Sequence, residues 1–329
     1  MPVVTIKAPE YYFINFIKLN AGLRKNHMEK PPNRKLGIII ITYNNLCNTL
    51  CALDSVTASD YKDKETLVVD NCSTPEYRDR LQSICKEKFP DTKILYLEKE
   101  YGYGGACNIG AQYFIEKGIS IFLFLNNDVM LHPHCISQLA MNIDEDNVLI
   151  GPKVYYGFSN RLYSAGGFFN ETFMIVKNRG NGQFDKGQYD EKEKVEFING
   201  CAFLISAKIF SEMNGFDENF YYYSEESDLC FRIINSGYKI IYEPQAIVYH
   251  WVSTTFGNES KKSIYYLVRS NLYFVSKHSP NIIIFFNHCL YLLYEYVIML
   301  VLRRLAHILT RVAVVFEAVK DFIMDKPGK

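Results

Sequence analysis

The chain has 329 residues, of which 48% are hydrophobic, so it is long enough for one large α/β domain or two smaller ones with a sizeable core. Lysine plus arginine equals aspartate plus glutamate at 36 each, and no dense basic run is interleaved with aromatic residues. We therefore expect a folded protein with no nucleic-acid partner.

The nine cysteines are an odd number without a Cys-x-x-Cys pair, which is typical of a reducing compartment. The aromatic segment 11–17 is short and is interrupted by Asn15, so we expect no secretion signal and a cytoplasmic protein. A proline-containing linker over 30–34 predicts an N-terminal extension, residues 1–34, before a domain that begins near residue 35.

Apolar, β-branched runs then alternate with helical patterns along the chain. The runs that predict strands are 36–42, 66–70, 93–97 and 119–125, and the segments that predict helices are 46–57, 75–88 and a stretch that begins near Gly105. Strands that alternate with helices in this way form a mostly parallel sheet with helices on both faces. We therefore predict an α/β fold.

From about residue 151 to 200 the sequence becomes glycine-rich and polar, and we expect a mobile region that covers a ligand. An ordered apolar segment follows over 195–206, then a short helix over 207–213 and a turn at Gly215-Phe216-Asp217.

The last fifty residues have a different pattern. Segment 282–302 is apolar apart from Asn287, His288 and Glu295, which makes it more polar than a lipid-exposed span. Beyond it, apolar residues recur at helical spacing over 305–323 on the face opposite these basic residues: Arg303, Arg304, His307, Arg311 and Lys320. Two interpretations remain open for 281–329, a helical pair packed on the domain and an in-plane anchor to an anionic membrane surface.

Polar side chains follow each of the four predicted strands. They are Thr42-Tyr43-Asn44, Asp70-Asn71-Cys72-Ser73, Gly102-Tyr103-Gly104-Gly105 and Asn126-Asn127-Asp128. The carboxyl ends of parallel strands meet at one edge of the sheet, so these residues should converge on one crevice. The carboxylate of Asp128 suits Mg²⁺ or Mn²⁺ held by a diphosphate, although an Asn-Asn-Asp run by itself is also typical of a turn.

The glycines at 102, 104 and 105 precede a helical run with Asn108 in its first turn, where backbone N–H groups can meet phosphate. A dinucleotide-binding fold would instead need Gly-x-Gly-x-x-Gly after the first strand. Thr42-Tyr43-Asn44 stands there, which argues against an NAD-type oxidoreductase.

A second polar cluster contains Glu225, Glu226 and Asp228, between an aromatic segment and an apolar helix. Acidic residues also favour the first turn of any helix, but partial desolvation here would make one of them an effective general base. The predicted strand 240–250 ends in His250, which could join Asp128 on a divalent metal.

Taken together, these motifs resemble the inverting nucleotide-sugar transferases of glycosyltransferase family 2, and especially their bacterial rhamnosyltransferase-like branch. The resemblance spans about residues 36 to 280. Besides the strand-end residues, it rests on these segments: Asn108-x-Gly110, Ser164-Ala165-Gly166-Gly167, Asn199-Gly200-Cys201, Gly215-Phe216-Asp217-Glu218, Glu225-Glu226-Ser227-Asp228-Leu229-Cys230-x-Arg232 and His250.

The resemblance implies a GT-A fold over 35–280 and a role for each matching residue. Donor binding would fall to Thr42, Tyr43, Asn44, Asp70, Asn71, Gly102, Gly104, Gly105, Asn108, Asn126 and Asn127. Asp128 and His250 would bind Mg²⁺ or Mn²⁺, Glu226 would be the general base, and Glu225 or Asp228 would position the acceptor or the base. Gly200, Cys201 and Arg232 would contact the acceptor.

Two positions depart from the family pattern. The Asp-x-Asp motif has become Asn126-Asn127-Asp128, with one carboxylate, and the second acid of the Glu-Asp-x-Asp motif is Glu226. Which of the two glutamates is the base therefore stays open.

The resemblance implies an enzyme that transfers a sugar to a lipid-linked or cell-surface glycan at the inner face of the cell membrane, as a peripheral protein. Rhamnose from dTDP-rhamnose is the first expectation for the donor, and a UDP-linked hexose is the alternative. A sugar-nucleotide-binding module without catalysis is the alternative from another functional class.

Overall fold

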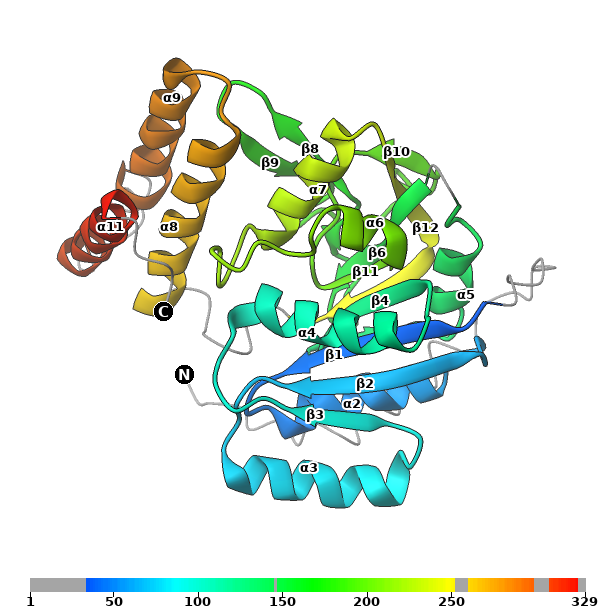
Figure 1. Ribbon diagram of the computed structural model, residues 1–329. Coiled ribbons are helices and arrows are strands. Elements are labelled where there is room, and N and C mark those ends of the chain that lie inside the picture. Colours follow the sequence, from blue (N-terminus) through cyan, green and yellow to red (C-terminus); the bar gives the residue numbers. More distant parts are fainter. Residues whose placement is uncertain (1–33, 145–146, 252–259, 299–307, 325–329) are drawn as a thin grey trace.

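A computed structural model describes residues 34–144, 147–251, 260–298 and 308–324 (Figure 1). The strands are β1 (Leu36–Thr42), β2 (Lys64–Asp70), β3 (Lys93–Tyr96), β4 (Ile121–Asn126), β5 (Val129–Leu131), β6 (Asn147–Tyr156), β7 (Leu162–Ser164), β8 (Gly167–Asn170), β9 (Ile175–Asn178), β10 (Glu193–Val195), β11 (Ala202–Ser206) and β12 (Lys239–His250). The helices are α2 (Leu46–Thr57), α3 (Pro75–Lys88), α4 (Gly102–Glu116), α5 (Cys135–Ala140), α6 (Ala207–Glu212), α7 (Glu225–Asn235), α8 (Lys261–His278), α9 (Ile282–Leu293), the π-helix η1 (Tyr294–Ile298) and α11 (Ile308–Ile323).

The main sheet has the strand order β10-β12-β6-β11-β4-β1-β2-β3, with β5 added beside β12 and β7 beside β6. Strands β3, β2, β1 and β4 are parallel, as predicted, and β11 continues the sheet antiparallel to β4. The four predicted strands and the helices between them are confirmed, and with them the mostly parallel α/β architecture.

Helices cover both faces of this sheet, and β1 shows why its sequence is a continuous apolar run. Ile38 and Ile40 pack into the core beneath α2, α3 and α5, whereas Ile39 and Ile41 pack into the core beneath α4, α6 and α7. In Figure 1, α4 crosses the near face of the sheet and α2 lies behind it. Because successive side chains of a strand point to opposite faces, a strand buried on both sides needs an apolar residue at every position.

Local signals fix the helix ends. Helix α3 begins after Thr74, whose hydroxyl accepts a hydrogen bond from the Tyr77 N–H, and Pro75 occupies its first position. Lys86 and Lys88 lie in its last turn, where a positive charge is favourable. The helix has the predicted range, 75–88.

The expectation of a mobile covering region over 151–200 is wrong. This segment contains most of β6, the strands β7 and β10, and the hairpin β8–β9. The glycines suggested a continuous loop, but several of them occupy turns between strands. Gly166, Gly180 and Gly182 in these turns have φ between 73° and 75°.

Two helices differ from the prediction. Helix α4 begins at Gly102 rather than near Gly105, so the glycines form its first turn instead of a loop before it. Helix α8, 18 residues long, was not predicted. Its N-terminus is capped by Ser260, whose hydroxyl accepts from the Ser263 N–H.

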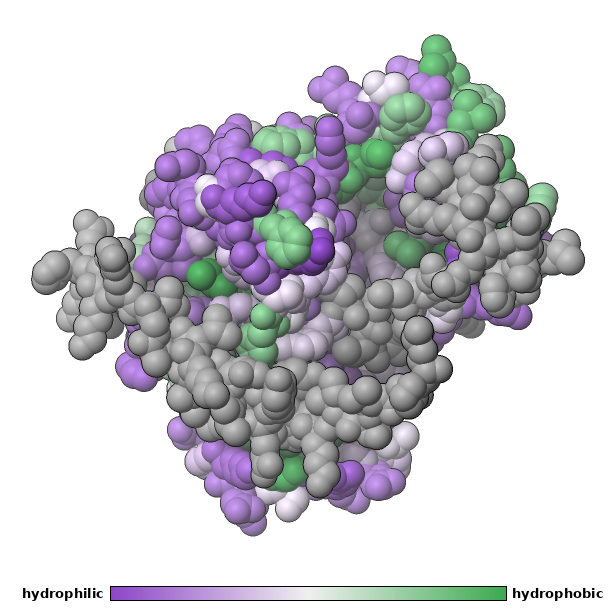
Figure 2. Space-filling view, turned by 180° about the vertical axis from the view of Figure 1, so that it is seen from behind, coloured by the Kyte–Doolittle hydropathy of each residue, from purple (hydrophilic) through white to green (hydrophobic). Residues whose placement is uncertain are grey.

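The C-terminal helices pack on the domain through one face and leave another exposed. Ile264, Val268 and Leu272 of α8 pack with Leu292 and Val314. On α9, Ile282, Ile283, Phe286 and Leu290 are 60 to 67% exposed, and Figure 2 shows hydrophobic residues gathered at this end of the molecule. None of the described helices has both the length and the apolar character needed to cross a bilayer. The predicted residues Arg303, Arg304 and His307 and the extension 1–33 lie outside the described ranges.

Candidate active site

The polar residues predicted to converge do meet at one edge of the sheet. Thr42 is in register with Asp70 on β2, and the preceding residue, Ile41, is in register with Asn126 on β4. Asn71 joins this edge to the start of α4, because its Oδ1 accepts from the Tyr101 N–H at 2.9 Å and its Nδ2 donates to the Gly102 carbonyl at 3.1 Å.

Asp70 is fully buried, and within the described ranges only one of its two carboxylate oxygens is hydrogen-bonded. Its Oδ2 accepts from Arg78 Nε at 2.6 Å and from the Ser73 N–H at 3.2 Å. Its Oδ1 has no hydrogen-bond partner in the described part of the chain. A buried carboxylate oxygen without a partner is costly, and an N–H group of a ligand would satisfy it.

Thr42 and Asn127 face inward rather than toward a ligand. The Thr42 hydroxyl is hydrogen-bonded to Thr49 Oγ1 at 2.7 Å, to the Tyr77 hydroxyl, and to Asn127 Nδ2 at 3.2 Å. Both predicted donor-binding side chains are therefore engaged in a buried network that fixes the ends of β1 and β4. Asn44 is exposed and has a left-handed φ of 49°, and its Oδ1 accepts from the Thr74 N–H at 2.9 Å.

The glycines of α4 let this helix approach the segment that precedes α7. Gly102 has a φ of +71°, and a Cβ there would lie 2.3 Å from the Tyr221 carbonyl oxygen. A Cβ on Gly104 would lie 3.0 Å from Phe216 Cβ. Asn108 strengthens this contact, because its side-chain amide exchanges two hydrogen bonds, of 2.8 and 2.9 Å, with the Phe216 backbone.

Gly105 and Tyr43 complete the predicted donor set at this edge. Gly105 also lies at a close contact, since a Cβ on it would be 3.1 Å from Tyr101 Cβ, and Tyr43 is half-buried beside Asn44. Close backbone approach thus explains the glycines of α4.

Asp128 and His250 form a pair, as predicted, although 121 residues separate them in the sequence. Strand β5 runs antiparallel to β12 with His250 opposite Val129, which brings His250 Nε2 to 3.2 Å from Asp128 Oδ1. Both residues are less than a tenth exposed. Burial disfavours the charged imidazolium, but Cys201 and the Asp128 carboxylate favour it more, so the pKa of His250 is raised to about 10.

This pair fits two neighbouring ligands of a divalent cation. Because metal–oxygen bonds to Mg²⁺ are about 2.1 Å long, two adjacent ligands of an octahedral ion lie about 3 Å apart. Cation binding there would require a neutral imidazole, because a protonated His250 Nε2 has no lone pair to donate to a metal. In the described ranges no three His, Cys, Asp or Glu side chains form a ligand cluster, so the other ligands would come from a substrate or from water.

Asn126 and Cys201 join β4 to β11 beside this pair. The Asn126 N–H donates to the Cys201 carbonyl at 2.9 Å, and the Cys201 N–H donates to Asn199 Oδ1 at 3.0 Å. Asn126 Oδ1 is buried and has no hydrogen-bond partner in the described ranges.

The two glutamates occupy the first turn of α7 in different environments. Glu225 is buried, whereas Glu226 is half-buried and packs against Gly200, where a Cβ would lie 3.3 Å from Glu226 Cβ. The Tyr103 hydroxyl holds Gly200 in place by donating to its carbonyl at 2.9 Å. Burial raises the pKa of both carboxyl groups, and that of Glu225 is raised well above its ordinary value because Glu226 lies beside it.

Asp228 and Arg232 contact each other and the surrounding scaffold. Asp228 is fully buried, and its carboxylate contacts Arg232 Nε and Lys277 at 2.7 and 2.8 Å and His278 Nε2 at 2.7 Å. Arg232 also donates to the carbonyls of Met213 and Gly215. Asp228 therefore connects α7 to α8, whereas Arg232 connects α7 to residues 213–215.

Tyr163 is a site residue that the sequence did not single out. Its ring lies edge-on to His250, with centroids 4.9 Å apart. Burial is the main cause that raises the pKa of the Tyr163 hydroxyl, and Cys201 and Glu226 raise it further. Its position directly before Ser164-Ala165-Gly166-Gly167 was the signal available in the sequence.

Comparison with known proteins agrees with this geometry. Residues 37–213 match the family model described as glycosyl transferase family 2. A dTDP-rhamnosyl transferase of Shigella flexneri is 25% identical over 223 residues, which cover 66% of this chain and 69% of that protein. A rhamnosyltransferase of Escherichia coli strain K12 is 25% identical over 198 residues, covering 52% of this chain and 72% of that protein.

Among solved structures, a mannosyltransferase from Pyrobaculum calidifontis in complex with GDP-Man and Mn²⁺ superposes with a TM-score of 0.57. The superposition covers 97% of this chain and 95% of that one at 14% sequence identity. A likeness at this identity shows the fold, and the GT-A fold is thereby confirmed.

Proposed function

This chain belongs to glycosyl transferase family 2 and is a glycosyltransferase, and from that premise we propose that it uses Mg²⁺ or Mn²⁺ to transfer a sugar with inversion to an acceptor hydroxyl. The observation that carries the proposal is the buried Asp128–His250 pair just beyond β4, with the ring of Tyr163 edge-on to His250. Rhamnose from dTDP-rhamnose is the proposed donor sugar, supported by the rhamnosyltransferase relatives. A UDP-linked hexose is the alternative.

The nucleoside of the donor would bind between the ends of β1 and β2. Asp70 Oδ1, buried and without a protein partner, would accept from an N–H of the base. Tyr43 and Asn44 would form the rim of this site, and the first turn of α4, from Gly102, would lie along the diphosphate with its backbone N–H groups. The network of Thr42 and Asn127 would hold these strand ends in place.

Asp128 Oδ1 and His250 Nε2 would hold the divalent cation, and oxygens of the donor diphosphate would complete its coordination. A cation there stabilises the negative charge that develops on the leaving nucleoside diphosphate. The carboxylate of Asp128 keeps the pair anionic when His250 is deprotonated, so the site remains attractive to a cation.

Glu226 would act as the general base. Its carboxylate would take the proton from the acceptor hydroxyl as that oxygen forms a bond to the anomeric carbon and the bond from this carbon to the diphosphate breaks. Attack and departure on opposite faces of the carbon invert its configuration. Glu225 is buried, so it would be less accessible to an acceptor hydroxyl than the half-buried Glu226.

Gly200 and Cys201 would border the acceptor next to Glu226, because Gly200 packs directly against that side chain. Asp228 and Arg232 would act as positioning residues, Asp228 through its contacts with α8 and Arg232 through its hydrogen bonds to the carbonyls of residues 213 and 215.

The acceptor would be a lipid-linked or cell-surface glycan, reached from the inner face of the cell membrane. The exposed apolar face of α9 supports membrane association, because Ile282, Ile283, Phe286 and Leu290 would gain from burial at a lipid surface. The amphipathic segment 281–329 was predicted to be either an anchor or a packed helical pair. Helix α9 has features of both, because Leu292 packs with the other C-terminal helices while apolar residues on another face are exposed.

The test is to incubate the full chain with a panel of nucleotide sugars and measure release of nucleoside diphosphate with and without EDTA. We expect Mn²⁺- or Mg²⁺-dependent release from one donor, and loss of both release and Mn²⁺ binding in Asp128→Asn. A matched control is Asp60→Asn, because Asp60 forms a 2.7 Å pair with His134 away from this edge of the sheet.

Release that persists in EDTA and in Asp128→Asn would refute the metal-dependent mechanism. Donor binding without transfer to any acceptor, unchanged by Glu226→Gln, would favour a non-catalytic sugar-nucleotide-binding module.

A further inference from the structure

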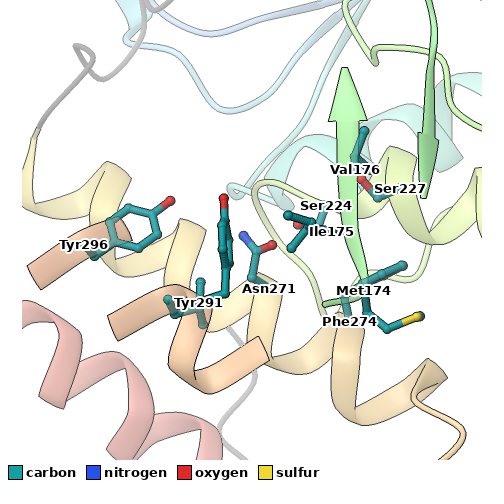
Figure 3. A pocket seen from close by; sticks show the side chains of 10 residues that line it. Met174, Ile175, Val176, Ser224, Ser227, Asn271, Phe274, Tyr291 and Tyr296 are labelled. Atoms are coloured by element: carbon teal, nitrogen blue, oxygen red, sulfur yellow. The ribbon is translucent and has the colours of Figure 1, made fainter. Parts of the chain in front are cut away.

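A cavity of about 150 Å³ lies beside the first turn of α7, where β9, α8, α9 and η1 meet (Figure 3). Ser224 and Ser227 line it from the α7 side, and these two residues bracket Glu225 and Glu226 in the sequence. The first turn of α7 therefore both borders the cavity and carries Glu226, the proposed base.

The cavity wall contains several polar groups without protein partners. In the described ranges no hydrogen bond is made by the hydroxyls of Tyr291 and Tyr296 or by the side chains of Ser224 and Ser227, and Ser224 does not cap α7. Asn271 donates through Nδ2 to the carbonyl of Leu267 at 2.7 Å, which leaves its Oδ1 as an acceptor. Figure 3 shows the two tyrosine hydroxyls directed to the same side, with Asn271 between Tyr291 and Ser224.

Two unusual backbone segments border this cavity. Ser224, which lines it, has a φ of 66°, and the preceding residues Tyr221 and Tyr223 have φ values of 64° and 66°, which cost energy for residues with a Cβ. On the other side, Tyr291 lies in the last turn of α9 and Tyr296 lies in the π-helix η1 that follows it. Residues five apart are about 140° apart around an α-helix, but the wider π turn brings them closer to one face. This turn explains how Tyr291 and Tyr296 both reach the cavity.

The residue types that line the cavity indicate the chemical class of ligand that would fit it. None of the ten lining residues is charged, and the wall combines hydroxyl and amide groups with the rings of Phe274 and the two tyrosines. Uncharged hydrogen-bonding groups beside aromatic rings suit a molecule that carries hydroxyls around an apolar ring face. A cavity of about 150 Å³ is large enough for one six-membered ring.

We propose that this cavity binds a neutral sugar ring of the acceptor glycan, next to the hydroxyl that Glu226 deprotonates. The inference rests on the proposed transfer reaction and adds the acceptor class and the residues that recognise it. It also gives the C-terminal helices a direct role, because Asn271 belongs to α8, Tyr291 to α9 and Tyr296 to η1. Without these helices the acceptor subsite would be incomplete.

The test uses ligand-observed saturation-transfer NMR on the full chain with Mg²⁺ and either dTDP or UDP. The probes are neutral methyl glycosides of glucose, galactose, mannose, N-acetylglucosamine and rhamnose, with methyl glucuronide as the charged comparison. We expect at least one neutral glycoside to bind without being displaced by the nucleotide. Tyr291→Phe and Asn271→Leu each remove one hydrogen-bonding group while keeping the size of the side chain, and should weaken that binding about 3- to 10-fold.

Tyr294→Phe is the matched control, because it removes the same hydroxyl from an exposed position on η1, outside the cavity, and should leave the binding unchanged. The inference is overturned if no neutral glycoside binds, if both cavity variants bind as the unaltered chain does, or if the glucuronide binds equally well. Release of nucleoside diphosphate in the donor assay is independent of these outcomes, so failure of the subsite is distinguishable from failure of the proposed transferase reaction.

Discussion

The buried carboxylate of Asp228 should contribute measurably to stability, and Asp228→Asn tests this. Its contacts with Arg232, Lys277 and His278 connect α7 to α8. The amide keeps the size of the side chain but removes the negative charge, so Arg232 loses this carboxylate partner and, among the described residues, Lys277 keeps only its pair with Asp217. We expect the variant to fold and to lose about 2 to 4 kcal/mol of unfolding free energy at pH 7.

The magnitude and its pH dependence follow from the carboxyl pKa. Burial alone would raise that pKa, but His278, Arg232 and Lys277 together lower it from 3.8 to about 2. At 1.36 kcal/mol per unit, this shift corresponds to about 2 kcal/mol. Because the pKa is lower in the folded state, the stabilisation is present above pH 3.8 and is lost as the pH falls toward 2. The difference between the unaltered chain and the variant should therefore fall to about half by pH 3.

Urea unfolding followed by circular dichroism at pH 7 and pH 3 measures this difference. Glu212→Gln is the control, because Glu212 and Lys208 have the same four-residue spacing on a helix, but their side chains are exposed and 3.8 Å apart. We expect that change to cost less than about 0.5 kcal/mol. A cost for Asp228→Asn as small as that of the control, or one that is equal at both pH values, would refute the reasoning.

Three further predictions concern the site and its surroundings. Glu225→Gln should retain transfer within about tenfold, whereas loss of the base at Glu226 should cost at least 10²-fold in kcat. Because burial, and after it Glu226, raises the pKa of Glu225 in the folded chain, the variant should also gain stability relative to the unaltered chain as the pH rises above 4.5, measured as Tm between pH 5 and 8. Gly102→Ala should destabilise the protein by more than Gly118→Ala, because both glycines have a φ of +71° but only Gly102 has a backbone oxygen 2.3 Å from the added Cβ; urea unfolding measures both. The pair of changes Ile283→Lys and Phe286→Lys should reduce co-sedimentation with anionic vesicles, because these exposed residues would no longer enter the lipid interface.

Each of these predictions has a contrary outcome. Complete loss of transfer in Glu225→Gln would assign the base to that glutamate. Equal destabilisation of the two glycine variants would show that the contact with Tyr221 is not the reason for Gly102. Unchanged co-sedimentation of the lysine variant would remove α9 as the membrane-facing surface.

Much of the donor side of the site was predictable because its signals are local. The apolar runs that became β1, β2 and β4 end at Thr42, Asp70 and Asn126, and the rule for parallel strands is sufficient to bring these ends together. The rule does not give the direction of each side chain. Thr42 was predicted to face the donor but is buried in a network with Thr49 and Tyr77.

The region from 151 to 200 shows where composition misleads. Glycine and polar residues suggested a mobile cover, yet strands as short as three residues form here, between turns at glycines such as Gly166 and Gly180. Such strands have too few residues for an apolar alternation to be recognised, and their pairing partners lie far away in the sequence.

The sequence by itself determined the α/β class, the first four strands and the edge at which the polar motifs gather, because the spacing of apolar residues and the turn residues act within a few positions of one another. Only the tertiary structure decided that Asp128 meets His250, that Glu226 is more accessible than Glu225, and that α8, α9 and η1 close a cavity beside α7. These outcomes depend on which elements pack against each other, and that choice is made by burial and shape over the whole chain, which local residue patterns do not encode.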